Sequence, residues 1–496
     1  MPKFASLADI QTALRNGQTT CRAIVEHYLS QIENTRHLNA YVEVWADEAL
    51  AKADALDARL RTTFSPSHSP TPSHLGRLCG AVISIKDNIC YAEHQVTAAS
   101  KILEGFTSLY SATAVERLLT EDAIIIGRTN CDQFGMGSSN ENSVYGPVRN
   151  AADPERVPGG SSGGAAVSVQ ADTCLAALGS DTGGSVRQPA AFCGIWGLKP
   201  TYGRISRHGL IAYGSSFDQI GVLANNPSDI SLLLEIMAGP DEFDATAVDG
   251  TRYTVHGSIS EPSTVYRQPS AVKIAYFPEA LESEGLESGV RARTLNFIEK
   301  MRTAGHTVEA VPFSLLEYVI PAYYVLTTAE ASSNLARYDG IRYGHRSSTA
   351  NNLEETYLRS RTEGFSEEVK RRILLGTFVL SSGYYDAYYT KAQQVRALIR
   401  QRVFAILKEY DFILMPAAPT TAWRFGEKSA EPVEMYLSDI YTVLANLAGI
   451  PALAIPAGLH PENNLPVGIQ LMAGPWEEGK LLWFAEEGRV RACLGV

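Results

Sequence analysis

The 496-residue sequence contains few cysteines, and none of them in a metal-binding arrangement. The seven cysteines are scattered and form no C-x-x-C pair: Cys21, Cys79, Cys90, Cys131, Cys174, Cys193 and Cys493. An odd, scattered set is typical of reduced thiols in a cytosolic protein, and it argues against a disulfide framework or a zinc site. We therefore expect the chain to bind no metal.

Positive charge is also in short supply. The chain has 43 Lys and Arg residues against 54 Asp and Glu residues, which gives a net charge of −11. A protein that grips a phosphate backbone by itself carries a basic surface, so any nucleic acid would be held mainly by a partner. The amino terminus shows no signal-peptide pattern, and no apolar run is long enough to span a membrane. We expect a soluble, cytoplasmic protein.

Hydrophobic patterning predicts one large α/β domain. Helical periodicity begins at Ser6, and a second helix begins at Thr19 or Thr20. Short apolar runs predict buried strands at residues 81–85, 123–126, 272–276, 412–415, 452–455 and 467–471. A long helical region covers residues 320–410. Strands near both ends of the chain, with helices between them, favour one central mixed sheet covered by helices on both faces.

Polar and Pro-containing stretches suggest divisions within this domain. We place boundaries around N-terminal helices (6–60), a surface loop (61–75), a catalytic core (80–240), a polar connector (256–270) and a helical and C-terminal strand region (271–496).

Two serines flanked by glycines are the most informative local feature. Ser161 lies in the run Gly159–Gly164, and Ser185 lies in the run Gly179–Arg187. Glycine lets backbone N–H groups approach a ligand closely, as an oxyanion hole requires. Glycine and serine runs are most often flexible linkers, but the segment between these two is apolar and belongs in a core. No lysine follows either run directly, so a phosphate-binding loop is disfavoured.

Each serine needs a base to become a nucleophile. Residues 159–163 match the G-x-S-x-G hydrolase elbow, but residues 153–158 are a poor strand and the ten histidines are dispersed. Lys86 follows the apolar run 81–85. A lysine near a strand end is usually a solvated charge, but burial would lower its pKa and let it act as a base.

These residues suggest a proton relay. Ser185 attacks, Ser161 passes the proton to Lys86, and Ser162 competes with Ser161 for the bridging role. The developing oxyanion is received by backbone N–H groups of the second loop: Thr182, Gly183, Gly184 and Ser185. Two charged residues of that loop are expected to shape and hold it: Asp181 and Arg187.

Longer motifs resemble the amidase signature family. The segments that carry the resemblance are residues 159–164, 179–190 and 193–201, with Ile85-Lys86-Asp87 upstream. The resemblance implies one amidase-signature domain and a Ser–cis-Ser–Lys triad. In that triad Lys86 is the base, Ser161 is the cis-serine and Ser185 is the nucleophile.

Within this family, further segments are similar to the glutaminase subunits of tRNA-dependent amidotransferases: residues 99–105, 130–142, 329–340 and 381–389. The similarity implies that the chain releases ammonia from glutamine for the conversion of Glu-tRNA(Gln) to Gln-tRNA(Gln). It also implies a heterotrimer with amidotransferase subunits B and C. Because the sequence has no Walker motif, we expect no cofactor to bind this chain, and we expect ATP and Mg to be used on a partner subunit.

Glutamine as a substrate needs a cation for its carboxylate and an anion for its amine. Arg372 and Asp439 resemble the family positions for these two roles, with Arg371 as a competitor of Arg372, and Tyr323 resembles a pocket-lining residue. A stand-alone amidase acting on acyl or aryl amides is the main alternative, and it would need neither charge. A non-enzymatic subunit is the second alternative, but packing alone does not call for Lys86 with two serines.

Overall fold

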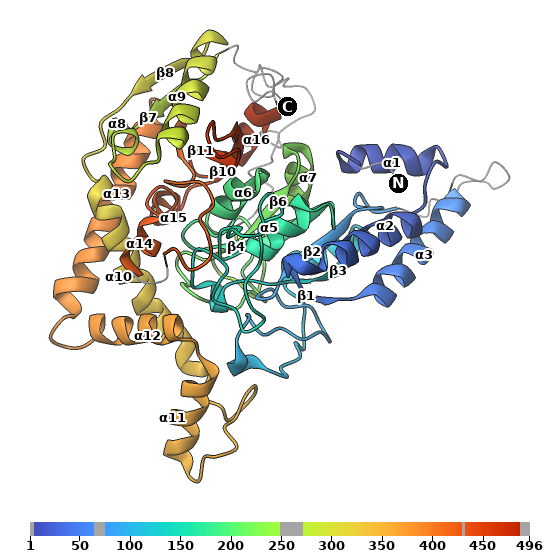
Figure 1. Cartoon of the computed structure of the whole chain (residues 1–496), viewed down its shortest axis with the longest axis horizontal. Helices are drawn as coiled ribbons and strands as arrows, with labels where there is room; N and C mark the ends of the chain where they lie inside the picture. The colour runs from blue at the N-terminus through green and yellow to red at the C-terminus, as the bar shows by residue number, and fades with distance from the viewer. Residues whose placement is uncertain (1–3, 64–74, 249–270, 429–431, 487–496) are drawn as a thin grey trace.

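The computed structural model describes residues 4–63, 75–248, 271–428 and 432–486. Within these residues the chain forms an α/β domain around one eleven-stranded mixed sheet, with helices on both faces (Figure 1). The predicted fold class is therefore confirmed. The predicted connector 256–270 and most of the predicted loop 61–75 lie outside the described residues. No helix in the described part of the chain is both long and apolar enough to cross a bilayer.

Eleven strands form the sheet in the order β1-β3-β2-β4-β6-β5-β10-β11-β9-β7-β8. Strand β2 pairs in parallel with β3 and β4, β7 pairs in parallel with β8 and β9, and the other pairs are antiparallel. Their bounds are β1 Tyr41–Val44, β2 Val82–Lys86, β3 Ile124–Thr129, β4 Ala176–Asp181, β5 Trp196–Lys199, β6 Gln219–Ala224, β7 Lys273–Tyr276, β8 Thr307–Ala310, β9 Phe412–Pro416, β10 Ala452–Leu459 and β11 Pro466–Met472.

Sixteen α-helices lie in the described residues. They are α1 Leu7–Arg15, α2 Cys21–Asn34, α3 Ala46–Thr63, α4 Thr113–Thr120, α5 Gly163–Gln170, α6 Arg187–Cys193, α7 Pro227–Met237, α8 Pro278–Leu281, α9 Ser288–Thr303, α10 Leu316–Asn334, α11 Leu353–Gly364, α12 Glu367–Val379, α13 Lys391–Leu407, α14 Pro432–Leu437, α15 Val443–Ala448 and α16 Glu478–Glu486. The side chains of Ser6 and Thr20 accept hydrogen bonds from backbone N–H groups in the first turns of α1 and α2, as N-caps do. Both predicted helix starts are confirmed, the second at Thr20.

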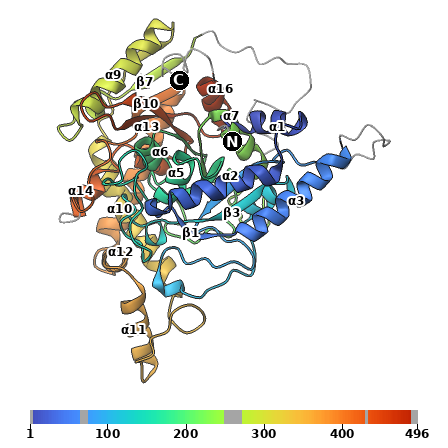
Figure 2. The ribbon, with the colours of Figure 1, turned by 45° about the vertical axis from the view of Figure 1, so that its right-hand side comes forward.

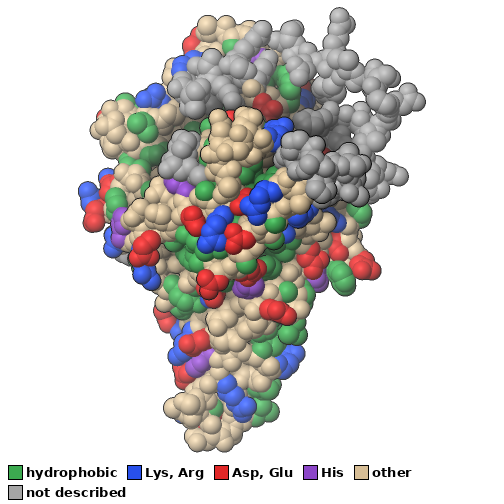
Figure 3. All heavy atoms as spheres, turned by 90° about the vertical axis from the view of Figure 1, so that its right-hand side faces the viewer, with side chains coloured by type: hydrophobic (Ala, Val, Ile, Leu, Met, Phe, Trp, Pro, Cys, Tyr) green, Lys and Arg blue, Asp and Glu red, His purple; other side chains and the backbone are tan. Residues whose placement is uncertain are grey.

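Several helices lie at the periphery of the domain. Helices α2 and α3 lie side by side, and α3 packs against β3 at one edge (Figure 2). Helix α11 projects away from the sheet in both ribbon views. On the face drawn in Figure 3, acidic and basic side chains are intermixed among the described residues.

The late strands complete the centre of the sheet. Strands β10 and β11 lie between β5 and β9, so residues near 452–472 sit beside residues near 196–199. This arrangement brings α15, which precedes β10, next to the second serine loop. Parts of the chain more than 250 residues apart therefore meet at one place.

Helix α6 packs unusually closely on the centre of the sheet. A Cβ atom on Gly468 of β11 would lie 2.3 Å from the Cβ of Ala191 in α6, and one on Gly197 of β5 would lie 2.6 Å from the Cβ of Ala190. Such distances are far inside ordinary van der Waals contact. Glycine at these two strand positions lets the helix approach the sheet.

This close packing gives a prediction for Gly468→Ala. The added methyl group must displace α6, so we expect the free energy of unfolding to fall by roughly 1–3 kcal/mol. The urea midpoint measures this loss. Gly383→Ala is the matched control, because a Cβ there meets nothing within 4 Å. Equal midpoints for the two variants would contradict the packing argument.

Candidate active site

Lys86 is the last residue of β2 and is fully buried. Its Nζ lies within hydrogen-bond distance of three hydroxyl oxygens: Ser161 Oγ at 2.7 Å, Ser180 Oγ at 2.9 Å and Ser162 Oγ at 3.0 Å. Burial lowers the pKa of Lys86, because an ammonium ion loses its hydration in the interior. The geometry places a lysine with a lowered pKa against the predicted bridging serine and against its competitor.

The first serine loop is fixed around Ser161. The peptide bond between Gly160 and Ser161 is cis. The N–H of Gly160 donates to Gln188 Oε1 (3.1 Å), and a Cβ on Gly160 would lie 2.2 Å from a carboxylate oxygen of Asp132. Asp132 in turn accepts hydrogen bonds from the N–H groups of residues 140 and 142. Gly160 therefore packs directly against a buried carboxylate that was not among the predicted site residues.

Ser185 lies just before α6 and next to the first loop. Its carbonyl accepts a hydrogen bond from the N–H of Ser162 (3.1 Å), which brings the two predicted serine loops together. Ser185 is 9% exposed, whereas Lys86 and Ser161 are completely buried. The Ser185 hydroxyl makes no hydrogen bond to any other residue that the structure describes. Of the three predicted triad residues, Ser185 is therefore the one open to a substrate.

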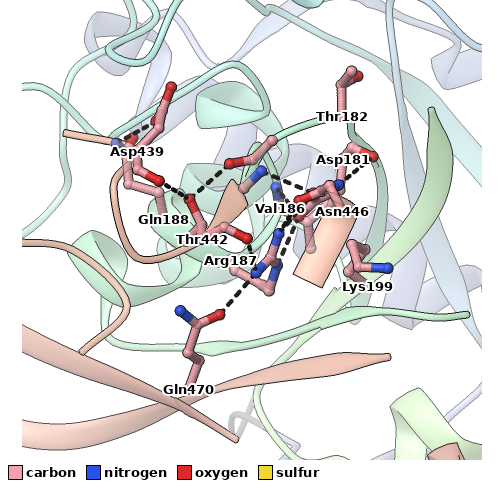
Figure 4. Close-up of polar contacts among 12 residues, drawn as sticks. Asp181, Thr182, Val186, Arg187, Gln188, Lys199, Asp439, Thr442, Asn446 and Gln470 are labelled. Carbon is pink, nitrogen blue, oxygen red and sulfur yellow. Dashed lines mark hydrogen bonds and ion pairs between the residues drawn. The ribbon is translucent and has the colours of Figure 1, made fainter. Parts of the chain in front are cut away.

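A buried ion pair holds the second loop in shape (Figure 4). The Arg187 guanidinium donates to both carboxylate oxygens of Asp181, at 3.0 and 3.1 Å. Its remaining donors reach Asn446 Oδ1 (2.7 Å), Gln470 Oε1 (2.8 Å) and the carbonyl of Thr442 (2.8 Å). Burial by itself would raise the pKa of Asp181, but the adjacent guanidinium outweighs it and lowers that pKa to about 2. Asp181 is thus a structural anion.

The predicted oxyanion-hole donors differ in their surroundings. The N–H of Gly184 donates to Asp181 Oδ1 (2.9 Å), so an oxyanion would have to share this donor with a carboxylate. Thr182 is anchored through its hydroxyl, which donates to the buried carboxylate of Asp218 (2.6 Å). The Gly183 carbonyl accepts from Thr442 Oγ1 (2.7 Å). The N–H groups of Thr182, Gly183 and Ser185 donate to no residue that the structure describes, so they stay available to an oxyanion, and their role stays a prediction.

Arg372 is buried in the protein, whereas its neighbour Arg371 is exposed. Arg372 is 2% exposed, and it donates to Tyr213 Oη (2.7 Å) and Glu368 Oε1 (2.8 Å). Its second terminal nitrogen, Nη2, is buried and has no hydrogen-bond partner in the described part of the chain. Arg371 is largely exposed and pairs with Glu368 at the surface. Of these two arginines, Arg372 is the one with a buried donor that no described residue accepts from, as a site for a carboxylate requires.

Asp439 lies near Arg372 and shares a tyrosine with it. The Asp439 carboxylate accepts from Ser138 Oγ (2.8 Å) and from Tyr324 Oη (3.1 Å), and the Tyr324 ring lies under the Arg372 guanidinium at 5.5 Å. Burial raises the pKa of Asp439 to about 7. The predicted pocket residue Tyr323 lies against the second loop, because a Cβ on Gly183 would be 2.3 Å from its hydroxyl.

Several residues of this site were not predicted. Some lie inside the motif segments 130–142 and 179–190, where a polar residue type was the only signal: Asp132, Ser138, Ser180 and Gln188. Others lie in α10, in α15 or just before α15 and carry no sequence signal: Tyr324, Asn446 and Thr442. Their contribution depends on the sheet order, which places α10 and α15 against the second loop.

Fold and site together define an α/β protein with a buried lysine–serine cluster beside a rigid, glycine-rich serine loop. Comparison with known proteins agrees with this description. The model of the family described as Amidase matches residues 23–482. The chain therefore belongs to the amidase family of enzymes.

Similarity to individual proteins extends along almost the whole chain. It is 48% identical over 486 residues to the A subunit of glutamyl-tRNA(Gln) amidotransferase from Chlorobium phaeobacteroides (strain BS1), covering 98% of both chains. It is 50% identical over 483 residues to the protein of the same name from Chlorobium luteolum, covering 97% of this chain and 96% of that one. The crystal structure of the same protein from Thermotoga maritima matches with a TM-score of 0.73 and 38% identity, covering 93% of this chain and 90% of that one.

The ion pair predicts a large and pH-dependent effect of Arg187→Met. Leaving Asp181 as an uncompensated buried charge should lower the free energy of unfolding by about 3–5 kcal/mol at neutral pH. Since the folded pKa of Asp181 is about 2, below its ordinary value, the pair stabilises fully above about pH 4 and loses its effect as pH falls toward 2. In the variant, burial without the guanidinium raises the pKa of Asp181, so its carboxyl group becomes protonated already above pH 4. The difference between wild type and variant should therefore begin to shrink above pH 4 and continue to shrink toward pH 2 in urea titrations.

The double variant Asp181→Asn/Arg187→Met is the control, because it removes both charges. It should recover part of the lost stability. A single variant as stable as wild type at pH 7 would show that the pair is not required.

Proposed function

We propose that this chain is the glutaminase subunit of a tRNA-dependent amidotransferase, and that it hydrolyses glutamine to supply ammonia for the conversion of Glu-tRNA(Gln) to Gln-tRNA(Gln). One observation carries the proposal: a buried lysine with a lowered pKa contacts Ser161 beside the accessible Ser185. The chain combines this geometry with similarity over 98% of its length to a protein named as the A subunit of such an enzyme.

In the proposed mechanism, neutral Lys86 acts as the base. A neutral amine donates two hydrogen bonds and accepts one, so one of its three serine contacts reverses direction and a hydroxyl donates to it. Ser161 gives its proton to Lys86 and takes one from Ser185. Ser185 Oγ then bonds to the side-chain amide carbon of glutamine, and the resulting oxyanion is received by the N–H groups of Thr182, Gly183 and Ser185.

Collapse of this intermediate breaks the carbon–nitrogen bond. The proton held by Lys86 returns through Ser161 to the leaving nitrogen, and ammonia departs. A water molecule then attacks the Ser185 ester along the same relay, which releases glutamate and restores the free hydroxyl. No step needs histidine or a metal.

The amino-acid part of glutamine suits the two charged groups near the loop. The unpaired Nη2 of Arg372 is proposed to bind the α-carboxylate, and Asp439 the α-ammonium. Tyr323 lies against Gly183 of the second loop, and the Tyr324 hydroxyl donates to Asp439 (3.1 Å), so both tyrosines lie between the elements that would bind glutamine and line its site. Subunits B and C are proposed to complete a heterotrimer, in which a partner holds the tRNA and uses ATP with Mg.

The relay predicts a graded series of serine variants. We expect Ser185→Ala to abolish ammonia release from glutamine, and Ser161→Ala to reduce kcat by roughly 10²–10⁴-fold, because proton transfer is lost. Ser162→Ala is the matched control, since Ser162 also contacts Lys86, and it should cost less than about tenfold. Ammonia release is measured with the chain alone and with its partner subunits.

Two outcomes would contradict the proposal. Glutamine hydrolysis that survives Ser185→Ala would refute the nucleophile assignment. Turnover of acyl or aryl amides with no turnover of glutamine, alone or with the partners, would identify a stand-alone amidase instead.

The raised pKa of Asp439 predicts a pH-dependent KM for glutamine. Below about pH 7 the carboxyl group becomes protonated and no longer pairs with an ammonium, so KM should rise as pH falls through 7. Asp439→Asn should have a high KM that varies little with pH, while Lys86 still governs kcat. A variant that keeps the wild-type KM profile would exclude Asp439 from substrate binding.

A further inference from the structure

A cavity of about 470 Å³ lies apart from the serine loops, between α13, the end of α15 and the loops that follow β5 and β11. Its size is within the range typical of small-molecule sites. The lining includes two arginines and, among the residues that the structure describes, no aspartate or glutamate. The Glu330 carboxylate accepts from Ser216 Oγ (2.5 Å) and attracts Arg396, whereas no ion pair among the described residues includes Arg400.

The first arginine is held rigidly. Arg396 donates to the carbonyl of Leu447 (3.1 Å) and to the hydroxyl and carbonyl of Ser216 (2.9 and 3.0 Å), and its guanidinium lies 4.1 Å from the centre of the Phe217 ring. A guanidinium has five N–H donors, so these three bonds leave donors for a ligand. The orientation is fixed before any ligand arrives, which lowers the entropic cost of binding.

The second arginine has no counter-charge in the described part of the chain. Arg400 lies one helical turn after Arg396 on α13, on the same face. Its guanidinium lies over the Phe404 ring at 5.0 Å and makes no ion pair with any described residue. Two adjacent guanidinium groups lining one cavity repel each other, and an anion between them would relieve that repulsion.

The rest of the lining is suited to a flat apolar group. Tyr202 and Trp476 contribute aromatic side chains, and Leu447, Ala448 and Ala397 contribute aliphatic surface. Tyr202 is fixed by a hydrogen bond from its hydroxyl to the carbonyl of Ser215 (2.8 Å). We propose that this cavity is a second binding site, for a small organic anion that carries a carboxylate or phosphate on a flat ring.

The cavity is separated from the active site by a layer of aromatic rings. Arg396 stacks on Phe217, whose ring meets that of Tyr323 edge-on at 5.8 Å, and Tyr323 lies against Gly183. The two sites are thus neighbours but distinct, and their ligands enter different spaces. The proposal does not depend on which amide the active site hydrolyses.

Binding is tested directly by calorimetry with the full chain, using phenyl phosphate and benzoate as probes. Benzyl alcohol tests the ring without charge, and inorganic phosphate tests charge without the ring. We expect at least one charged aromatic probe to bind more tightly than either partial probe. Whether phenyl phosphate or benzoate binds better tells a phosphate ligand from a carboxylate ligand.

Three exposed positions of α13 supply the variants. Arg400→Gln should weaken probe binding by roughly tenfold or more, because a charge-assisted hydrogen bond is lost. Ala397→Trp keeps both charges but fills the cavity, and it should also weaken binding. Arg402→Gln removes a charge from the same helix outside the cavity lining and should bind like wild type.

Thermal unfolding verifies that each variant is folded. The proposal is wrong if neither charged probe binds up to about 10 mM, or if Arg400→Gln and Ala397→Trp bind like Arg402→Gln. Inorganic phosphate that binds as tightly as the better of the two charged aromatic probes would also contradict it, since the ring would then contribute nothing.

Discussion

The buried pair of Arg187 and Asp181 is the interaction on which the active site depends. A charge without water must be compensated completely, and Arg187 achieves this only with groups from α15 and β11. The second serine loop therefore takes its shape only when Thr442, Asn446 and Gln470, from the C-terminal part of the chain, are in place. One carboxylate also receives the N–H groups of Gly184 and Val186, so the same anion that pairs with arginine fixes the backbone on either side of Ser185.

Lys86 is also buried, but no counter-ion among the described residues lies in contact with it. It is as deeply buried as Arg187, but its hydrogen-bond partners are hydroxyls, and the carboxylates of Asp132, Asp181 and Asp218 act on it only from a distance. Its ammonium form is therefore disfavoured, whereas the guanidinium of Arg187 is compensated by a carboxylate in direct contact. Burial disfavours the charged form of Asp439 as well, and because this group is an acid, burial raises its pKa, to about 7. A buried group with an opposite charge in direct contact, such as Asp181, is therefore structural. A buried group without one, such as Lys86, has a shifted pKa that suits it to proton transfer.

Much of the fold could be predicted from local pattern, because apolar runs mark the central strands and capping residues mark the helix starts at Ser6 and Thr20. Lys86 and the serine loops were also identifiable, since reactive residue types within glycine runs stand out. The roles of Tyr324, Thr442 and Asn446 could not be predicted, because they depend on β10 and β11 entering the sheet beside β5. The hydrogen bond between Gly184 and Asp181 depends on loop geometry that residue types do not specify. The proposed domain boundaries stay predictions.

The central claim is that Lys86 is a neutral base at working pH. The most direct measurement is the pH dependence of the rate at which a fluorophosphonate reagent modifies Ser185 in the full chain, followed by mass spectrometry. The account predicts that the rate rises with pH to a plateau, with a midpoint clearly below the pKa of about 10.4 of an ordinary lysine. A midpoint at or above that value would contradict it, because Lys86 would then remain charged where the enzyme is expected to work.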